Sequence, residues 1–178
     1  VNLATGLGGS GRQAGSAFKT FTLVAALEAG ISPDTLIDCS TTANFPGWTV
    51  SNIGHHDYGT RSLASAFAVS SNTGFARLIL SLGPEKVVEV AHRMGIESNL
   101  QAVGSLTLGS ESVTPLEMAD AYATIANGGT HYGPSCILRI EDRNGNVLED
   151  HSAPEGEQAL TPEVARAAVE VMKGVIES

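Results

Sequence analysis

The most constraining feature of the sequence is an apolar helical pattern close to its start, over residues 16–29. Large apolar side chains cover most of its circumference: Phe18, Phe21, Leu23, Val24 and Leu27. Gly30 then ends the pattern, as a glycine just beyond a helix commonly does, and Pro33 follows shortly afterwards. A helix with so little polar surface must be enclosed by other elements, so the pattern predicts a globular domain built around one buried helix.

The length and charge of the chain are consistent with such a domain. With 178 residues, of which 42% are apolar, the chain can bury a sizeable core as one unit, residues 1–178. Ten basic residues stand against nineteen acidic ones, so the sequence lacks the clustered basic face of a nucleic-acid-binding protein. No apolar run reaches the eighteen residues that a membrane span needs.

Four further helical patterns, one hairpin and one long irregular segment follow along the chain. The helices are expected at 61–82, with a polar break at 70–72, and at 84–94, 114–127 and 161–178, the hairpin at 135–149 and the irregular segment at 38–60. Thr114, Pro115 and Glu117 have the spacing of a helix capping box. The pair Asn144-Gly145 is typical of a hairpin turn.

These expected elements contain far more helix than strand. A single hairpin cannot cover so many apolar helical faces in a mixed domain. We therefore expect an α/β (mixed α+β) fold that is rich in helix and has an incomplete central sheet. We also expect the chain to stop inside a longer domain.

Neither the histidines nor the cysteines have the spacing of a metal site. His55 and His56 lie in the irregular segment, where a solvent-facing pair is the simpler interpretation. A disulfide between Cys39 and Cys136 is allowed, although two isolated cysteines are more commonly small buried residues. We expect no metal and no cofactor.

The pattern that favours chemistry is the pair Ser16 and Lys19, three residues apart at the start of the first helix. Residues three apart share a helix face, so the amine of Lys19 can reach the hydroxyl of Ser16 and act as its base. Burial among apolar neighbours would lower the pKa of Lys19, which is the only charged residue between Arg12 and Glu28. The simpler alternative is a helix-capping serine followed by a surface lysine.

A second pattern, Ser70-Ser71-Asn72, lies in the polar break between two apolar helical halves. Such a break can direct Ser70 and Asn72 into a cleft, where Ser70 relays a proton and Asn72 holds a substrate amide. The alternative is again structural: Ser70 or Ser71 caps the next helix and Asn72 bonds its first turn.

Together, these motifs resemble the transpeptidase domain of penicillin-binding proteins, most closely the bifunctional class A kind. That family carries S-x-x-K, here Ser16 and Lys19, then S-x-N, here Ser70 and Asn72. The resemblance extends over nearly the whole chain. It includes Ala26–Ile31, Leu108-Gly109-Ser110, Val113–Met118, Ala121-Tyr122 and Ala126–Gly129.

Two departures from the family pattern stand out. Ala14 occupies a position where the family usually has proline, a change that we expect to be tolerated. The third family motif, K-[ST]-G, is missing, because none of Lys19, Lys86 and Lys173 precedes Thr-Gly or Ser-Gly. The chain is therefore expected to stop just before the strand that carries it.

The resemblance implies a serine-type D-Ala-D-Ala transpeptidase that cross-links peptidoglycan stem peptides through an acyl-enzyme on Ser16. β-Lactams would acylate the same serine, and the missing lysine would bind the substrate carboxylate. The resemblance further implies a parent protein that is anchored at the extracytoplasmic face of a bacterial membrane and carries a glycosyltransferase domain. Without K-[ST]-G, the chain alone is expected to be catalytically incomplete.

Three alternatives stay open at this level. A serine β-lactamase shares the fold and the first motif but hydrolyses its acyl-enzyme quickly. A β-lactam sensor domain binds the drug and signals. A non-catalytic protein keeps the fold as a binding scaffold.

The incomplete sheet also predicts how the chain behaves in solution. Because a sheet edge and apolar helical faces are left uncovered, we expect the chain to self-associate. Light scattering tests this expectation, and a monodisperse monomer of 18.4 kDa would contradict it.

Overall fold

A buried helix lies at the centre of the structure, a computed structural model that describes residues 2–6 and 11–177. This helix, α1 (Lys19–Glu28), follows directly on a 3-10 turn, η1 (Gly15–Phe18). All side chains from Lys19 to Ala26 are buried. The expected central helix is confirmed, with one correction: Ser16 lies in the tighter 3-10 turn and not in the α-helix itself.

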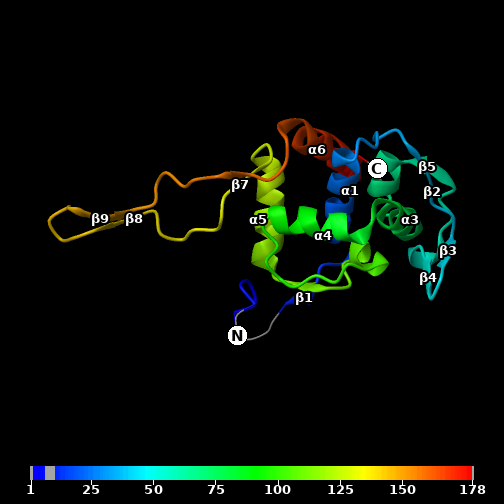
Figure 1. The fold of residues 1–178 in the computed structure, drawn as a ribbon, viewed down its shortest axis with the longest axis horizontal. Coiled ribbons are helices and arrows are strands. Elements are labelled where there is room, and N and C mark those ends of the chain that lie inside the picture. Colours follow the sequence, from blue (N-terminus) through cyan, green and yellow to red (C-terminus); the bar gives the residue numbers. More distant parts are fainter. Residues whose placement is uncertain (1, 7–10, 178) are drawn as a thin grey trace.

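Among the described residues, five further helices pack on α1 or on its neighbours. Figure 1 shows the helical body that they form with α1. They are α2 (Leu63–Ala68), α3 (Asn72–Leu82), α4 (Pro84–Arg93), α5 (Pro115–Ala126) and α6 (Pro162–Glu177). Helices α3, α4 and α6 pack directly on α1. The core contains Phe21 and Val24 of α1 with Phe75 and Ile79 of α3. Burial of this kind contributes about 25 cal/mol per Å² of apolar surface.

The ends of these helices follow the sequence patterns closely. Helix α5 begins at the expected capping box, in which Glu117 N donates to Thr114 Oγ1 at 3.1 Å and Thr114 N donates to Glu117 Oε2 at 2.6 Å. Glu117 also accepts hydrogen bonds from the backbone N–H groups of Glu97 and Ser98. The capping box therefore fixes both the start of α5 and the loop beside it.

The strands that the structure describes form only two-stranded antiparallel pairs. The pairs are β1 (Arg12–Gln13) with β6 (Ser112–Val113), β2 (Leu36–Asp38) with β5 (Thr60–Ser62), β3 (Thr42–Phe45) with β4 (Trp48–Ser51), β7 (Thr130–His131) with β10 (Glu157–Gln158), and β8 (Arg139–Glu141) with β9 (Val147–Asp150). A 3-10 turn, η3 (Gly104–Leu108), precedes β6. The expected helix-rich mixed fold is thus confirmed.

The segment 38–60 corrects the sequence prediction, because it is not irregular. Strands β3 and β4 form a hairpin in which Phe45 pairs with Trp48 across Pro46-Gly47. Gly47 has φ 72°, the left-handed conformation that the second position of such a turn requires and glycine readily adopts. The Pro-Gly pair was the available turn signal, and the short polar strands on either side obscured it.

The predicted hairpin β8–β9 forms the end of an arm that extends away from the helical body (Figure 1). The arm leaves and rejoins the body where β7 pairs with β10. Both cysteines are free: Cys39 is buried in the core and Cys136 is exposed on the arm. Within residues 2–6 and 11–177, no helix is both long and apolar enough to cross a membrane.

The capping box gives a stability test that does not involve the site. Replacing Thr114 by alanine removes the acceptor for Glu117 N, which we expect to cost about 1 kcal/mol of unfolding free energy. For a chain of this size, the midpoint of thermal unfolding should fall by about 2–4 °C. Thr35→Ala, at an exposed loop position, is the matched control. Equal midpoints for the two variants would contradict the assigned cap.

Candidate active site

Ser16 lies in an exposed turn that is held from two sides. Strand β1 pairs with β6, and Gln13 Nε2 donates to Ser110 O at 2.9 Å. Gly109 packs so closely that a Cβ atom there would lie 2.2 Å from Gly15 N. Gly109 has φ 69° as well, so both space and backbone conformation require glycine at this position. The turn that carries Ser16 is therefore fixed against β6 and the loop before it.

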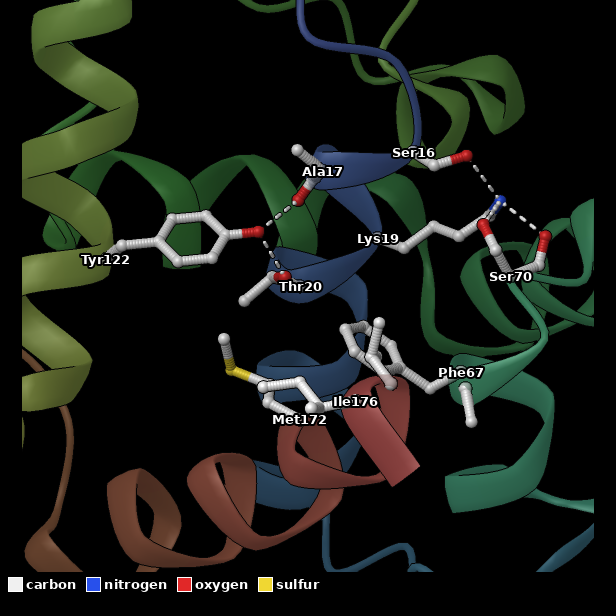
Figure 2. A pocket seen from close by; sticks show the side chains of 11 residues that line it. Ser16, Ala17, Lys19, Thr20, Phe67, Ser70, Tyr122, Met172 and Ile176 are labelled. Atoms are coloured by element: carbon white, nitrogen blue, oxygen red, sulfur yellow. Dashed lines mark hydrogen bonds between the residues drawn. The ribbon is translucent and has the colours of Figure 1, made fainter. Parts of the chain in front are cut away.

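Lys19, one turn further along, places its amine between the two predicted motifs. Its Nζ lies 2.9 Å from Ser16 Oγ, 3.0 Å from Ser70 Oγ and 2.8 Å from Asn72 Oδ1. It also donates to Ser70 O at 2.9 Å. Figure 2 shows the Nζ atom between the hydroxyls of Ser16 and Ser70. The structure thus brings together all four residues that the sequence singled out.

Burial sets the charge state of this amine. Lys19 is only 1% exposed, and the loss of hydration lowers its pKa from 10.5 to about 8. This burial excludes the alternative in which Lys19 is a surface lysine that follows a helix-capping serine. A lysine with a pKa near 8 exists partly as the neutral amine at neutral pH, which is the form that can accept a proton.

The four oxygens around Nζ also orient its lone pair. Ser70 O and Asn72 Oδ1 have no hydrogen to give, so they can only accept from the amine. A neutral amine has two N–H groups, and these two acceptors use both of them. Its lone pair is then left for the hydroxyls of Ser16 and Ser70, either of which can donate to it. The geometry suits proton transfer between Ser16, Lys19 and Ser70.

The polar break between α2 and α3 has an unusual backbone. Ser70 has φ 54°, a left-handed conformation that is uncommon for a residue other than glycine. Ser71 caps α3, since Gly74 N donates to its Oγ at 3.1 Å. The structural alternative is thus correct for Ser71, whereas Ser70 and Asn72 face Lys19.

Asn72 is oriented by a backbone carbonyl from the neighbouring hairpin. Its Nδ2 donates to Ser51 O at 3.1 Å, which turns Oδ1 towards Lys19. Asn52, which follows Ser51, is buried. Its Oδ1 accepts hydrogen bonds from Ser71 Oγ at 3.1 Å and from Thr73 N at 3.2 Å. Ser51 and Asn52 could not be predicted from the sequence, because neither forms a spaced motif with the four named residues.

A cavity of about 350 Å³ opens beside the serine–lysine pair. Ser16, Lys19 and Ser70 form its polar edge, while Phe67, Met172 and Ile176 contribute apolar surface, as Figure 2 shows. A mostly apolar hollow with a few converging polar groups is typical of a small-molecule site.

The histidines take no part in this site. His55 and His56 are exposed in the loop after β4. Among the residues that the structure describes, no three His, Cys, Asp or Glu side chains are placed to hold a metal ion.

The family model and the relatives that match the chain all belong to one family. Residues 9–178 match the family model for the penicillin binding protein transpeptidase domain. The chain is 36% identical over 170 residues to penicillin-binding protein 1A of Aquifex aeolicus, and 34% identical over 186 residues to penicillin-binding protein 1A of Mycobacterium tuberculosis. Each alignment covers 93% of this chain and 23% of the relative.

Solved structures with the same fold include the penicillin-binding protein PonA1 of Mycobacterium tuberculosis, with a TM-score of 0.87 and 32% identity. That match covers 97% of this chain and 48% of PonA1, whose complex with penicillin V is also known. The D,D-transpeptidase domain of a peptidoglycan glycosyltransferase from Eggerthella lenta matches with a TM-score of 0.86 and 26% identity, over 100% of this chain and 51% of that one.

The structure thus has a serine hydroxyl within hydrogen-bond distance of a buried lysine amine at the start of a central helix, in a mixed fold of helices and short strands. The family model and the relatives show that the chain belongs to the penicillin-binding protein transpeptidase family. It spans about a quarter of the length of the curated relatives and about half of the solved chains.

Lys19 should make folding stability depend on pH. The unfolded chain keeps a lysine pKa near 10.5, against about 8 in the fold, so it binds more protons than the native state between these values. The contribution of Lys19 to the free energy of unfolding therefore rises with pH in that window, by about 2 kcal/mol between pH 7 and 9.5. Urea unfolding at the two pH values measures it in the wild type and in Lys19→Met, which should lack the increment.

Lys86→Met, at an exposed position on α4, is the matched control and should keep the full increment. The same pH dependence in Lys19→Met and Lys86→Met would contradict a lowered pKa for Lys19.

Proposed function

We propose that residues 1–178 are part of a serine-type D-Ala-D-Ala transpeptidase domain that cross-links peptidoglycan stem peptides. The observation that carries the proposal is the position of the Lys19 amine, 2.9 Å from Ser16 Oγ and 3.0 Å from Ser70 Oγ. The substrate class comes from family membership and from the relatives, which include a D,D-transpeptidase domain of a peptidoglycan glycosyltransferase.

In the proposed acylation, Ser16 is the nucleophile and neutral Lys19 is its base. Ser16 Oγ attacks the carbonyl carbon of the penultimate D-Ala while its proton moves to Lys19 Nζ. The resulting tetrahedral centre collapses, the C–N bond to the terminal D-Ala breaks, and Ser70 passes a proton from Lys19 to the leaving amine. Asn72 keeps Lys19 in place and holds the amide of the substrate.

Deacylation uses the same groups in reverse. The amine of a neighbouring stem peptide attacks the ester carbonyl and gives up its proton towards Lys19. The ester C–O bond then breaks, Lys19 returns a proton to Ser16 Oγ, and the new amide is the cross-link. A β-lactam follows only the first half: the lactam C–N bond opens, and the product stays attached to Ser16. PonA1, which has the same fold, is known in complex with penicillin V.

Two further features of the proposal concern the protein beyond this site. None of the three lysines of the chain precedes Thr-Gly or Ser-Gly, so the group that binds the substrate carboxylate in the family is not encoded here. By analogy with the matched penicillin-binding proteins 1A, we assign the whole protein to the extracytoplasmic face of a bacterial membrane, beside a glycosyltransferase domain.

Intact-mass spectrometry with penicillin tests the proposed nucleophile. We expect the mass of the protein to increase by that of one penicillin, because ring opening releases no leaving group. Ser16→Ala should lose the adduct, and Ser81→Ala, at an exposed position on α3, should keep it. The chain and the whole encoded protein are measured in parallel, because the chain lacks K-[ST]-G.

The outcomes separate the proposal from two of its alternatives, the serine β-lactamase and the binding scaffold. Rapid turnover of penicillin without a lasting adduct would favour a serine β-lactamase. An adduct that survives in Ser16→Ala would assign the nucleophile to another residue. No adduct even in the whole protein would overturn serine acylation and favour a binding scaffold.

A further inference from the structure

Tyr122, on helix α5, lies beside the serine–lysine pair but does not contact either residue through a hydrogen bond. Its hydroxyl reaches across to the start of α1, 3.0 Å from Ala17 O and 2.8 Å from Thr20 Oγ1. Figure 2 shows both contacts, with the tyrosine ring at the opposite end of the cavity from Ser70.

The direction of these hydrogen bonds follows from their chemistry. A backbone carbonyl can only accept, so Tyr122 gives its one hydroxyl proton to Ala17 O. Thr20 must then donate to the tyrosine oxygen. The result is a chain of two hydrogen bonds from Thr20 through Tyr122 to Ala17, and bonds in such a chain strengthen one another.

The same contacts argue against a proton-transfer role for Tyr122. Burial is the main influence on its hydroxyl and raises the pKa of Tyr122 above its usual value of 10. The phenol is therefore neutral at the pH values at which Lys19, with a pKa of about 8, changes charge. A neutral phenol whose proton is already given to Ala17 O is poorly placed to act as a base.

What the hydroxyl does instead is join two separately anchored elements. Ala17 is next to Ser16 in the exposed turn η1. Helix α5 is fixed at its start by the capping box, and further along Asp120 Oδ2 lies 2.7 Å from His131 Nε2. The tyrosine therefore ties the turn that carries Ser16 to a helix that is itself held in place.

We propose that Tyr122 is a positioning residue for the nucleophile: by holding the Ala17 carbonyl, its hydroxyl keeps the turn η1 in the position that places Ser16 Oγ against Lys19 Nζ. The proposal rests on the proposed function of Ser16. Rates of acyl transfer are sensitive to small misplacements of the attacking atom, so a tether of this kind should act on the rate of the chemical step.

Tyr122→Phe is a sharp test, because it removes one oxygen atom and keeps the ring that lines the cavity. We expect the limiting rate of acylation by penicillin to fall roughly three- to tenfold, the effect of losing one modest hydrogen bond. The penicillin concentration that gives half of that rate should stay unchanged. The pH midpoint of the rate should also stay unchanged. Tyr132→Phe, at an exposed tyrosine on the arm, is the matched control.

Amide hydrogen exchange provides a readout that does not depend on catalysis. In Tyr122→Phe, exchange should become faster over residues 15–18 and stay unchanged in α3 and α4.

Thr20→Val removes the other end of the hydrogen-bond chain. Because both changes act on one chain, the double variant should lose little more rate than Tyr122→Phe alone.

These measurements overturn the proposal in three distinct ways. Unchanged exchange over residues 15–18 would show that the hydroxyl does not hold the turn. Faster exchange with an unchanged limiting rate would show that the tether does not position Ser16. A shifted pH midpoint would assign Tyr122 to proton transfer. If the wild-type whole protein is not acylated at all, the proposed function fails, and the exchange data alone decide whether the tether exists.

Discussion

The burial of one amine governs much of this structure. Lys19 lies on a helix that is buried from Lys19 to Ala26, and water is almost entirely excluded from its side chain. A buried ammonium is tolerated only when oxygens replace its hydration shell. Here four oxygens from two distant segments, 16–19 and 70–72, converge on Nζ. The requirement to satisfy this amine therefore determines where the polar break between α2 and α3 must lie.

The arrangement of oxygens around Lys19 requires a strained backbone conformation at Ser70. Ser70 adopts a left-handed conformation, which costs on the order of 1 kcal/mol or more for a residue with a side chain. The neighbouring hydrogen bonds offset this cost, because Asn52 accepts from Ser71 and Thr73 and donates to the carbonyls of Cys39, Ser40 and His56. The hairpin β3–β4 contributes the Ser51 carbonyl, which orients Asn72, and supplies no side chain to Lys19.

The sequence predicted the elements whose signals are local. The capping box of α5, the turn of β8–β9 and the polar break at Ser70-Ser71-Asn72 each depend on neighbouring residues, and each lies where it was expected. The convergence of Ser16, Lys19, Ser70 and Asn72 could be predicted only because their spacings match a known family. Tyr122 was noted for that resemblance alone, and the Ser51 carbonyl was not foreseen. The contacts of Tyr122 and Ser51 arise from tertiary packing, which produces no periodic pattern in the sequence.

The pairing of β7 with β10 has a consequence for how the arm relates to the rest of the molecule. Because both ends of the arm lie next to the short antiparallel pair β7–β10, residues 132–156 project from the helical body as one long loop (Figure 1). Insertions and substitutions within this arm should therefore leave the packing around α1 unchanged. Its exposed thiol, Cys136, offers a point where a reporter group can be attached without disturbing the buried amine.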